Sequence, residues 1–398
     1  MDDDPRAYIY KHGGVFMIYM DNAATSYPKP EQVIEAVAEC MAGWCANPGR
    51  AGHEYAMRSS EEIYDTRKKA AAIVGAGAEA ENIIFTKNCT EALNMAIKGI
   101  LKKGDHVITT MMEHNSVLRP LFSAKKYGIE TSLLRCSSEG YPESGSLEKA
   151  LKKNTKMIIC TLSSNVTGTI MPVEELGAFA DKHGIIFIID AAQGLGSIPF
   201  DAKKCKAHAV AASGHKSLMG PQGTGFLYID STIRLQHIIE GGTGTESLEL
   251  KQPDKAPEGY EAGTLNVPGI TGLNAGLSYI LSEGIEKIRR KEKDLMECLH
   301  EELKDAEGII MYGPRDPAEK TAVLSLNIEG IDCEKTAALL NDEYGIGVRA
   351  GYHCAPLAHN AIGTENTGCV RLSPGLFSTY EDVMATAEAL RRIASEKC

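Results

Sequence analysis

The stretch Ser213-Gly214-His215-Lys216 decides how the fold of this chain is interpreted. It places a lysine directly after a small, polar turn that contains a glycine. The turn follows the apolar segment Ala209–Ala212, and Asp190 follows the apolar run Ile185–Ile189. Short apolar runs of this kind are typical of buried strands. The lysine and the aspartate therefore both come at the ends of expected strands.

One cofactor chemistry requires both of these groups. Pyridoxal phosphate (PLP) is held by a lysine amine as a Schiff base, while an aspartate pairs with its pyridinium nitrogen. That pairing keeps the ring protonated, so the ring accepts electrons from a substrate carbon. On Lys216 and Asp190 alone, a surface lysine and a strand-end acid that never meet explain the sequence equally well.

The composition is that of an ordinary soluble globular protein. The 398 residues are 43% hydrophobic and 24% charged, which allows two domains and a large core. A net charge of -11 without a Lys/Arg-rich block argues against nucleic-acid binding. No segment approaches the roughly 18 apolar residues of a membrane span, so no membrane association is expected.

The cysteines and the N-terminus indicate a cytoplasmic protein. Eleven dispersed cysteines point to reduced thiols rather than disulfides. The acidic start Met1-Asp2-Asp3-Asp4-Pro5 does not have the basic region of a signal peptide. No CxxC or His-rich spacing supports a metal site, and none is expected.

The middle of the chain alternates short apolar runs with helical patterns. Helices are expected from Glu91 to about Leu101 and over Val173–His183. The expected strands are 83–86, 107–110, 157–161, 185–189, 209–212 and 225–229. This alternation predicts an α/β fold with a mostly parallel sheet covered by helices on both faces.

After about residue 268 the pattern changes to a smaller α+β unit. A long charged helix is expected from Ser282 to about Ala306, with the domain boundary inside it or just before it. The expected elements beyond it are strands 321–328, 346–349 and 369–373 and helices 333–344 and 380–397. We divide the chain into an N-terminal extension (1–16), a large PLP-binding domain (17–268) and a small domain (269–398).

Polar residues gather directly after the expected strands. Because the carboxyl ends of parallel strands meet at one edge of a sheet, where ligands bind, these residues indicate one shared site. The groups are Asn88-Cys89-Thr90, Glu113-His114-Asn115, Ser164-Asn165, Asp190-Ala191-Ala192-Gln193 and Ser213-Gly214-His215-Lys216.

Three of these side chains have a defined use in a PLP site. Thr90 opens a helix beside Cys89, where N–H groups and a hydroxyl suit a phosphate, although a simple N-cap explains the pattern as well. The ring of His114 is able to stack on a planar cofactor. The amide of Asn165 is able to hydrogen-bond the phenolic oxygen of the cofactor.

The C-terminal unit adds a second strong signal. Cys354 lies in Gly351-Tyr352-His353-Cys354-Ala355-Pro356, a loop context that suits an accessible thiol rather than a core one. The alternative is a spare cysteine among eleven. Arg371 follows in the next strand, with a rigid fork suited to a carboxylate, and a surface ion pair is its alternative.

Taken in order, the motifs resemble those of the cysteine desulfurases and selenocysteine lyases, in the class V branch of fold-type I PLP enzymes. The resemblance runs from about Tyr19 to the C-terminus. It is carried by 19–25 (YMDNAAT), 47–53 (NPGRAGH), 90–94 (TEALN), 113–116 (EHNS), 164–168 (SNVTG), 190–193 (DAAQ), 213–216 (SGHK), 261–264 (EAGT), 349–355 (RAGYHCA) and 370–373 (VRLS).

The resemblance implies a seven-stranded, mostly parallel sheet between helices in the large domain. It also implies the cofactor site. Lys216 would form the Schiff base, Asp190 would pair with the ring nitrogen, Gln193 would contact the phenolic oxygen, His114 would stack on the ring, and Cys89, Thr90, Ser213 and His215 would hold the phosphate. Thr264 would reach the phosphate of the neighbouring subunit, which implies a homodimer with shared sites.

The substrate residues are implied in the same way. Asn165, Arg349 and Arg371 would bind the substrate, chiefly its carboxylate, in a pocket lined by Ala23 and Ala24. Cys354 would take sulfur from L-cysteine as a persulfide, leaving L-alanine, and would pass the sulfur to an acceptor protein. His114 or His353 would move the protons of the substrate thiol, and the sequence does not choose between them.

Three alternatives stay open. A selenocysteine lyase would act on L-selenocysteine, and another class V reaction, such as transamination or β-elimination, would not need Cys354. A non-catalytic PLP-fold partner would be expected to lack Lys216 or Asp190, and both are present. The chain also departs from the family pattern, with Tyr352 replacing a histidine, Cys89 in the phosphate loop, and His359 after the cysteine. These departures leave the substrate and the acceptor open.

Overall fold

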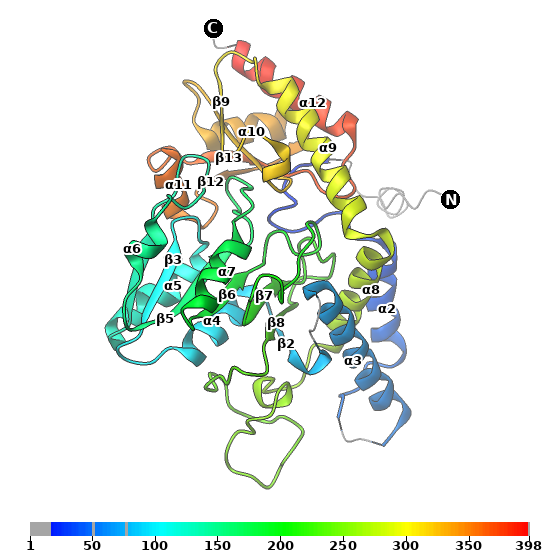
Figure 1. Cartoon of the computed structure of the whole chain (residues 1–398). Coiled ribbons are helices and arrows are strands. Elements are labelled where there is room, and N and C mark those ends of the chain that lie inside the picture. The colour runs from blue at the N-terminus through cyan, green and yellow to red at the C-terminus, as the bar shows by residue number, and fades with distance from the viewer. Residues whose placement is uncertain (1–16, 50–51, 76–78, 397–398) are drawn as a thin grey trace.

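The computed structural model describes residues 17–49, 52–75 and 79–396, so the expected extension over 1–16 lies outside it. Its centre is a seven-stranded sheet of order β2-β8-β7-β6-β5-β3-β4 (Figure 1). The strands are β2 (Ile83–Thr86), β3 (His106–Thr110), β4 (Glu130–Leu134), β5 (Thr155–Thr161), β6 (Ile186–Asp190), β7 (Ala209–Ser213) and β8 (Gly225–Ile229). Only the two pairs that involve β8 are antiparallel, which confirms the predicted sheet.

Helices cover both faces of this sheet, because alternate residues of each strand point to opposite sides. Met157 and Ile159 pack in a cluster with α4 and α5, whereas Ile158 and Cys160 pack in a second cluster with α3, α7 and α8. The helices of this part are α2 (Glu31–Gly43), α3 (Glu54–Val74), α4 (Cys89–Ile100), α5 (Asn115–Ala124), α6 (Ser146–Ala150), α7 (Val173–Lys182) and α8 (Val267–Glu283).

The predicted α+β unit forms a second layer above the large sheet in Figure 1. Its antiparallel sheet has the order β12-β13-β10-β9, and it has its own hydrophobic cluster. The elements are α9 (Ile285–Leu303), β9 (Ile309–Tyr312), β10 (Leu324–Ile328), α10 (Cys333–Tyr344), β12 (Arg349–Gly351), α11 (Pro356–Ile362), β13 (Cys369–Leu372) and α12 (Tyr380–Ser395).

Two predicted elements were wrong in detail. The single helix expected from Ser282 to Ala306 is two helices that meet at Gly284, whose φ of 80° ends α8 and begins α9. The strand expected over 346–349 divides into β11 (Ile346–Gly347) and β12, which pair with different partners. The edge strand β4 was not predicted.

The N-terminal strand joins the C-terminal layer. β1 (Ile18–Tyr19) pairs in parallel with β11, and Met20 is buried in the C-terminal cluster. Meanwhile α8 packs along α2 and α3 of the large part. The division at residue 268 stays a prediction, and these contacts favour Gly284 as the point where the two parts meet. Within the described ranges, no helix combines the length and apolar character needed to cross a membrane.

Candidate active site

A cavity of about 170 Å³ opens at the carboxyl ends of β5, β6 and β7. The structure thus brings together nine side chains that the sequence placed in one site. The lining residues are Asn88, Cys89, Thr90, His114, Ser116, Thr161, Ser163, Asn165, Asp190, Ala192, Gln193, Ser213, His215 and Lys216. Ser116, Thr161 and Ser163 also line the cavity, although the sequence assigned them no role in the site.

Lys216 follows β7 on the predicted tight turn. The turn requires a glycine, since a Cβ on Gly214 would lie 2.2 Å from Thr224 Oγ1. Burial lowers the pKa of the Lys216 amine, although the charge of Asp190 acts in the opposite direction. Among the described residues the amine has no hydrogen-bond partner. A lysine with a lowered pKa is available as a nucleophile or a base.

Asp190 ends β6 with one carboxylate oxygen already occupied. Its Oδ1 accepts from the Ala192 N–H (3.0 Å) and from the Cys89 thiol (3.3 Å). Burial, followed by the charge of Asp190, raises the pKa of the Cys89 thiol, which therefore stays protonated and donates. The thiol is thus engaged with the acid, and Cys89 is left with its backbone N–H, in the first turn of α4, for the predicted phosphate contact.

His114 caps α5 and is linked through Ser116 to Thr90. Its Nδ1 accepts from the Ser116 N–H (3.0 Å) and lies 2.8 Å from Ser116 Oγ, which is 2.7 Å from Thr90 Oγ1. Burial lowers the pKa of His114, again with Asp190 opposing. The ring is therefore neutral, and its proton is assigned to Nε2 because Nδ1 accepts.

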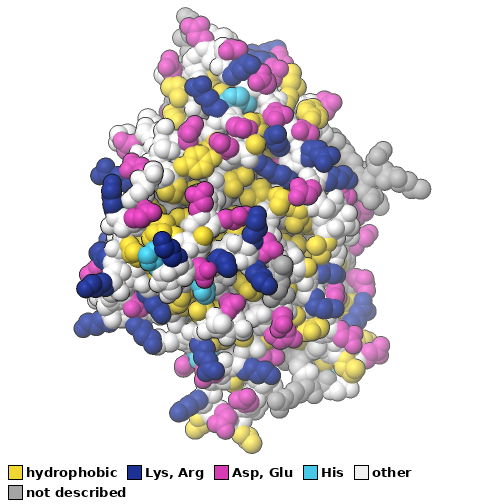
Figure 2. Space-filling model, in the orientation of Figure 1, with side chains coloured by type: hydrophobic (Ala, Val, Ile, Leu, Met, Phe, Trp, Pro, Cys, Tyr) yellow, Lys and Arg dark blue, Asp and Glu magenta, His cyan; other side chains and the backbone are white. Residues whose placement is uncertain are grey.

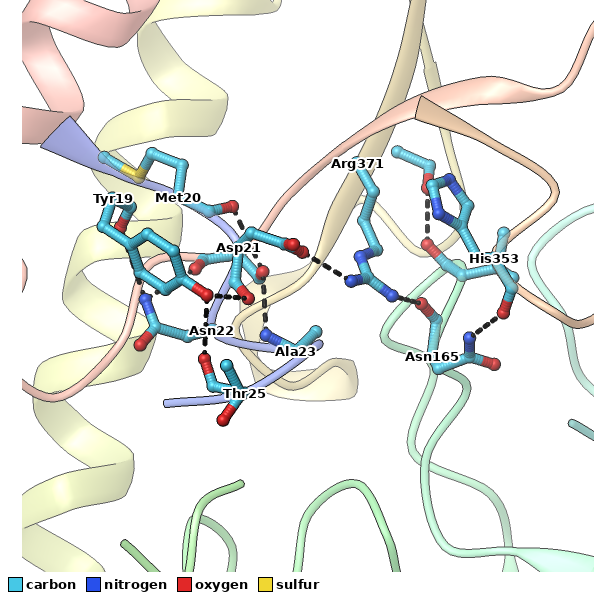
Figure 3. Close-up of polar contacts among 12 residues, drawn as sticks. Tyr19, Met20, Asp21, Asn22, Ala23, Thr25, Asn165, His353 and Arg371 are labelled. Atoms are coloured by element: carbon cyan, nitrogen blue, oxygen red, sulfur yellow. Dashed lines mark hydrogen bonds and ion pairs between the residues drawn. The ribbon is translucent and has the colours of Figure 1, made fainter. Parts of the chain in front are cut away.

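Arg371 forms the centre of the polar contacts in Figure 3. Its side chain in β13 is only 2% exposed, with one terminal nitrogen donating to the Asn165 carbonyl (3.0 Å) and the other to Asp21 Oδ1 (2.7 Å). Its Nε is buried and has no partner among the described residues. The ion pair of Arg371 is thus not on the surface, as the alternative supposed, because the arginine is buried. The Nε–H of Arg371 has no acceptor among the described residues.

The predicted pocket residues near the N-terminus are held by this same region. Ala23 donates its N–H to Ser373 Oγ (3.0 Å), and the Ala23 carbonyl accepts from Gln193 Nε2 (2.8 Å). The Gln193 amide expected at the phenolic oxygen is therefore bonded to the backbone here. Ala24 donates its N–H to the Asp21 carbonyl (3.0 Å).

Cys354 is exposed on a short loop that is fastened to the cavity at two points. The Asn115 N–H donates to the Cys354 carbonyl, and Asn165 Nδ2 donates to the His353 carbonyl, each at 2.7 Å (Figure 3 shows the second). Both His353 (φ 47°) and Cys354 (φ 58°) are left-handed, at a cost of order 1–3 kcal/mol each. Backbone strain of this kind persists only where the surrounding contacts hold the residues in place, as the bonds from Asn115 and Asn165 do here.

Six predicted residues do not line the cavity: Ala23, Ala24, Cys354 and Arg371, described above, and Arg349 and Thr264. Arg349 begins β12 opposite Arg371, and its positive charge contributes to the lowered pKa values of Lys216 and His114. Thr264 lines two larger hollows of about 200 and 580 Å³, and the second is also lined by the segment 242–245 and by Asn47-Pro48-Gly49. The chain alone thus does not bring Thr264 to the site.

A buried acid that sequence reasoning did not use lies beside the site. Glu113 is fully buried, and its Oε1 accepts from Thr110 Oγ1 (2.7 Å) and from the Thr161 N–H (3.1 Å). Burial raises the pKa of Glu113 to about 8, with the hydrogen bond from Thr110 opposing and the charge of Asp190 reinforcing the shift. The signal in the sequence was its place directly before His114.

Fold and site together define a class of protein. The chain belongs to the family described as Aminotransferase class-V, whose pattern matches residues 18–385. It is 38% identical over 377 residues to a "probable cysteine desulfurase" of Pyrococcus abyssi, covering 92% of both chains. It is 33% identical over 385 residues to another from Methanothermobacter thermautotrophicus, covering 95% of this chain and 94% of the other.

Solved structures agree with this. An apo structure of cysteine desulfurase from Thermococcus onnurineus NA1 superposes with a TM-score of 0.90 at 35% identity, covering 96% of this chain and 95% of the other. A cysteine desulfurase from Escherichia coli gives 0.85 at 28% identity, over 96% and 95% of the two chains. The family and fold type predicted from the motifs are confirmed.

Proposed function

We propose that this protein is a PLP-dependent cysteine desulfurase that takes sulfur from L-cysteine onto Cys354. The observation that supports the proposal is the double attachment of the Cys354 loop to Asn115 and to Asn165, because Asn165 and His114, the residue before Asn115, line the Lys216–Asp190 cavity. A spare cysteine would not need this attachment.

The residues of the cavity fit PLP. Asp190 has one oxygen fixed by Ala192 and Cys89, so the carboxylate has a fixed orientation for a ring nitrogen. Burial lowers the pKa of the Lys216 amine, and within the described chain no hydrogen bond holds this amine. Thr90 opens α4, whose first N–H groups suit a phosphate. When bound, PLP supplies an electron sink for the substrate carbon.

The chain's own residues then divide the work. Lys216 would hold the cofactor and, once displaced by the substrate amine, remove the Cα proton, because its lowered pKa keeps a fraction of the amine neutral. Arg371 would bind the substrate carboxylate through its unpaired Nε and the nitrogen now bonded to Asp21. Asn165 contacts both Arg371 and the Cys354 loop.

Sulfur transfer is a displacement at the substrate sulfur. The Cys354 thiolate attacks that sulfur, the substrate Cβ–S bond breaks, and Cβ keeps the electron pair and gains a proton. L-cysteine and the Cys354 thiol become L-alanine and the Cys354 persulfide, with no outside oxidant. Of the two histidines, His114 is the better proton carrier, because burial lowers the pKa of His353 to about 3 and its Nε2 is bonded to the Cys369 carbonyl.

A second copy of the chain would complete the site through Thr264. The loop between β8 and α8 extends from the lower end of the molecule in Figure 1, with hydrophobic side chains at its tip in Figure 2. Leu248 and Leu250 on this loop are essentially fully exposed. Large exposed apolar residues beside hollows mark an interface. Replacing both leucines with Asp should convert a dimer to monomers in sedimentation analysis.

The sulfur acceptor would be a protein that docks over Cys354. The loop is short and fixed at two points, so the thiol cannot travel far, and the acceptor must come to it. The ten cysteines of the described residues are free thiols, which supports a reducing, cytoplasmic location.

The test is to follow alanine, sulfide and persulfide together. With L-cysteine and reductant, Cys354→Ser should abolish the release of both alanine and sulfide. Mass spectrometry should find one added sulfur on Cys354 of the wild type. Cys45→Ser, which removes another exposed thiol, is the matched control and should leave both intact. Full alanine production by Cys354→Ser would refute the role of this thiol, and preference for L-selenocysteine in that variant would favour a lyase.

A further inference from the structure

A second group of buried donor atoms lies next to the Cys354 loop. It consists of His353 in the loop, His359 in α11 and Cys369 at the start of β13, and we call it the His353–His359–Cys369 cluster. The three side chains are 4%, 0% and 0% exposed. One donor atom from each lies within 4.8 Å of the donor atoms of the other two. No use for His359 or Cys369 follows from the proposed function.

Both histidines are held at one ring nitrogen and unpaired at the other. His359 Nδ1 lies 2.7 Å from Thr364 Oγ1, and His353 Nε2 lies 3.1 Å from the Cys369 carbonyl oxygen. Within the described chain, His359 Nε2 and His353 Nδ1 are buried without a hydrogen bond. Histidines that bind metals are arranged in this way, because an outer partner fixes one N–H and leaves the other lone pair for the ion.

We propose that the His353–His359–Cys369 cluster binds a zinc ion. Two imidazoles and one thiolate are a ligand set that zinc prefers, with a water as the fourth ligand. Binding would replace the Cys369 thiol proton, which is released to solvent. Zinc ligands sit about 3.5 Å apart, so binding would draw the three donors together by about 1 Å.

The three ligands come from three different elements around the Cys354 loop. His353 precedes Cys354, His359 lies in the helix that follows it, and Cys369 is in the strand that pairs with β12. An ion at this place would fasten the far side of the loop, opposite to the bonds from Asn115 and Asn165. The proposal does not depend on the reaction catalysed.

Metal binding to the full chain tests the proposal without any activity measurement. A Cys354→Ala background removes the exposed thiol, and chelator-treated protein is then titrated with Zn²⁺ or with Co²⁺ as a visible probe. We expect one metal per chain and a thiolate-to-cobalt absorption band. Cys369→Ser should abolish the band, whereas Cys205→Ser, which removes another buried thiol elsewhere, should keep it. Thr364→Val should weaken zinc affinity about 10–100-fold.

Two results would overturn the proposal. The first is absence of metal uptake by the Cys354→Ala protein, which would assign the two free nitrogens to a buried water. The second is uptake that Cys369→Ser and His359→Gln both leave unchanged, which would place the ion elsewhere. Circular dichroism and PLP absorbance establish that each variant is folded, and His359→Gln serves as the test if Cys369→Ser is not.

Discussion

Glu113 should make the folded protein less stable as the pH rises. Its carboxyl is fully buried and its pKa is raised to about 8 from an ordinary 4.5. A folded-state pKa above the unfolded one means that the native protein binds this proton more tightly. The stabilisation is therefore complete below about pH 4.5 and is lost as the pH rises through about 8.

The size of the effect follows from the shift. Each pKa unit corresponds to about 1.36 kcal/mol, so a shift from 4.5 to about 8 corresponds to about 5 kcal/mol across the window. Glu113→Gln keeps an acceptor for the Thr110 hydroxyl and the Thr161 N–H but removes the titration. The melting temperature of Glu113→Gln should rise relative to that of the wild type by about 5 °C between pH 5 and pH 9.

The assay is thermal unfolding of the PLP-loaded protein across that pH range at one scan rate. Glu148→Gln, at an exposed position, is the control and should follow the wild-type profile. If the Glu113→Gln and wild-type profiles run parallel from pH 5 to pH 9, the buried carboxyl does not hold a proton near neutrality and the reasoning is wrong.

Three further predictions concern single side chains. Arg371→Lys keeps the charge but loses the fork, and should raise KM for L-cysteine about 10–100-fold, measured by alanine release, since two charge-assisted hydrogen bonds become one; an unchanged KM would exclude Arg371 from the carboxylate. Arg67→Met leaves the Glu261 carboxylate of its 2.5 Å ion pair buried without a cation, and should destabilise the fold by about 3–5 kcal/mol in denaturant unfolding; a loss below 1 kcal/mol would contradict this. Gly177→Ala puts a Cβ 1.8 Å from the Cys205 carbonyl oxygen and should cost about 3 kcal/mol or more, whereas Gly43→Ala, with open space around it, should be tolerated.

The sequence predicted the central strands because they are buried on both faces and read as continuous apolar runs. It missed β4 since Glu130–Leu134 lies at the sheet edge, where most of its residues are partly exposed and the apolar signal is weak. It also began one helix at Ser282, before Gly284, because helical residues flank that glycine on both sides. The pattern of apolar and charged residues does not reveal the left-handed φ of one glycine.

The sequence predicted which residues meet at the strand ends to form the site. It did not predict the hydrogen bonds among them. The helix opening at Cys89 was expected, but its thiol bonds to Asp190, which is 101 residues away. The cluster of His353, His359 and Cys369 left no spacing signal, because its members meet only through the pairing of β12 with β13. Contacts of this range follow from packing that no single segment encodes.

The pairing of β1 with β11 has a consequence for how the protein is made. A ribosome produces Ile18 more than three hundred residues before its partner Ile346, and Asp21 long before Arg371. While synthesis continues, the first strand has no partner, and the pocket wall that carries Ala23 is not yet anchored by Ser373. The large sheet can form on the nascent chain, but the face that we propose for substrate binding is assembled only once β13 has emerged. A chain that stops early would therefore leave the large sheet without Arg371, the residue proposed to bind the substrate carboxylate.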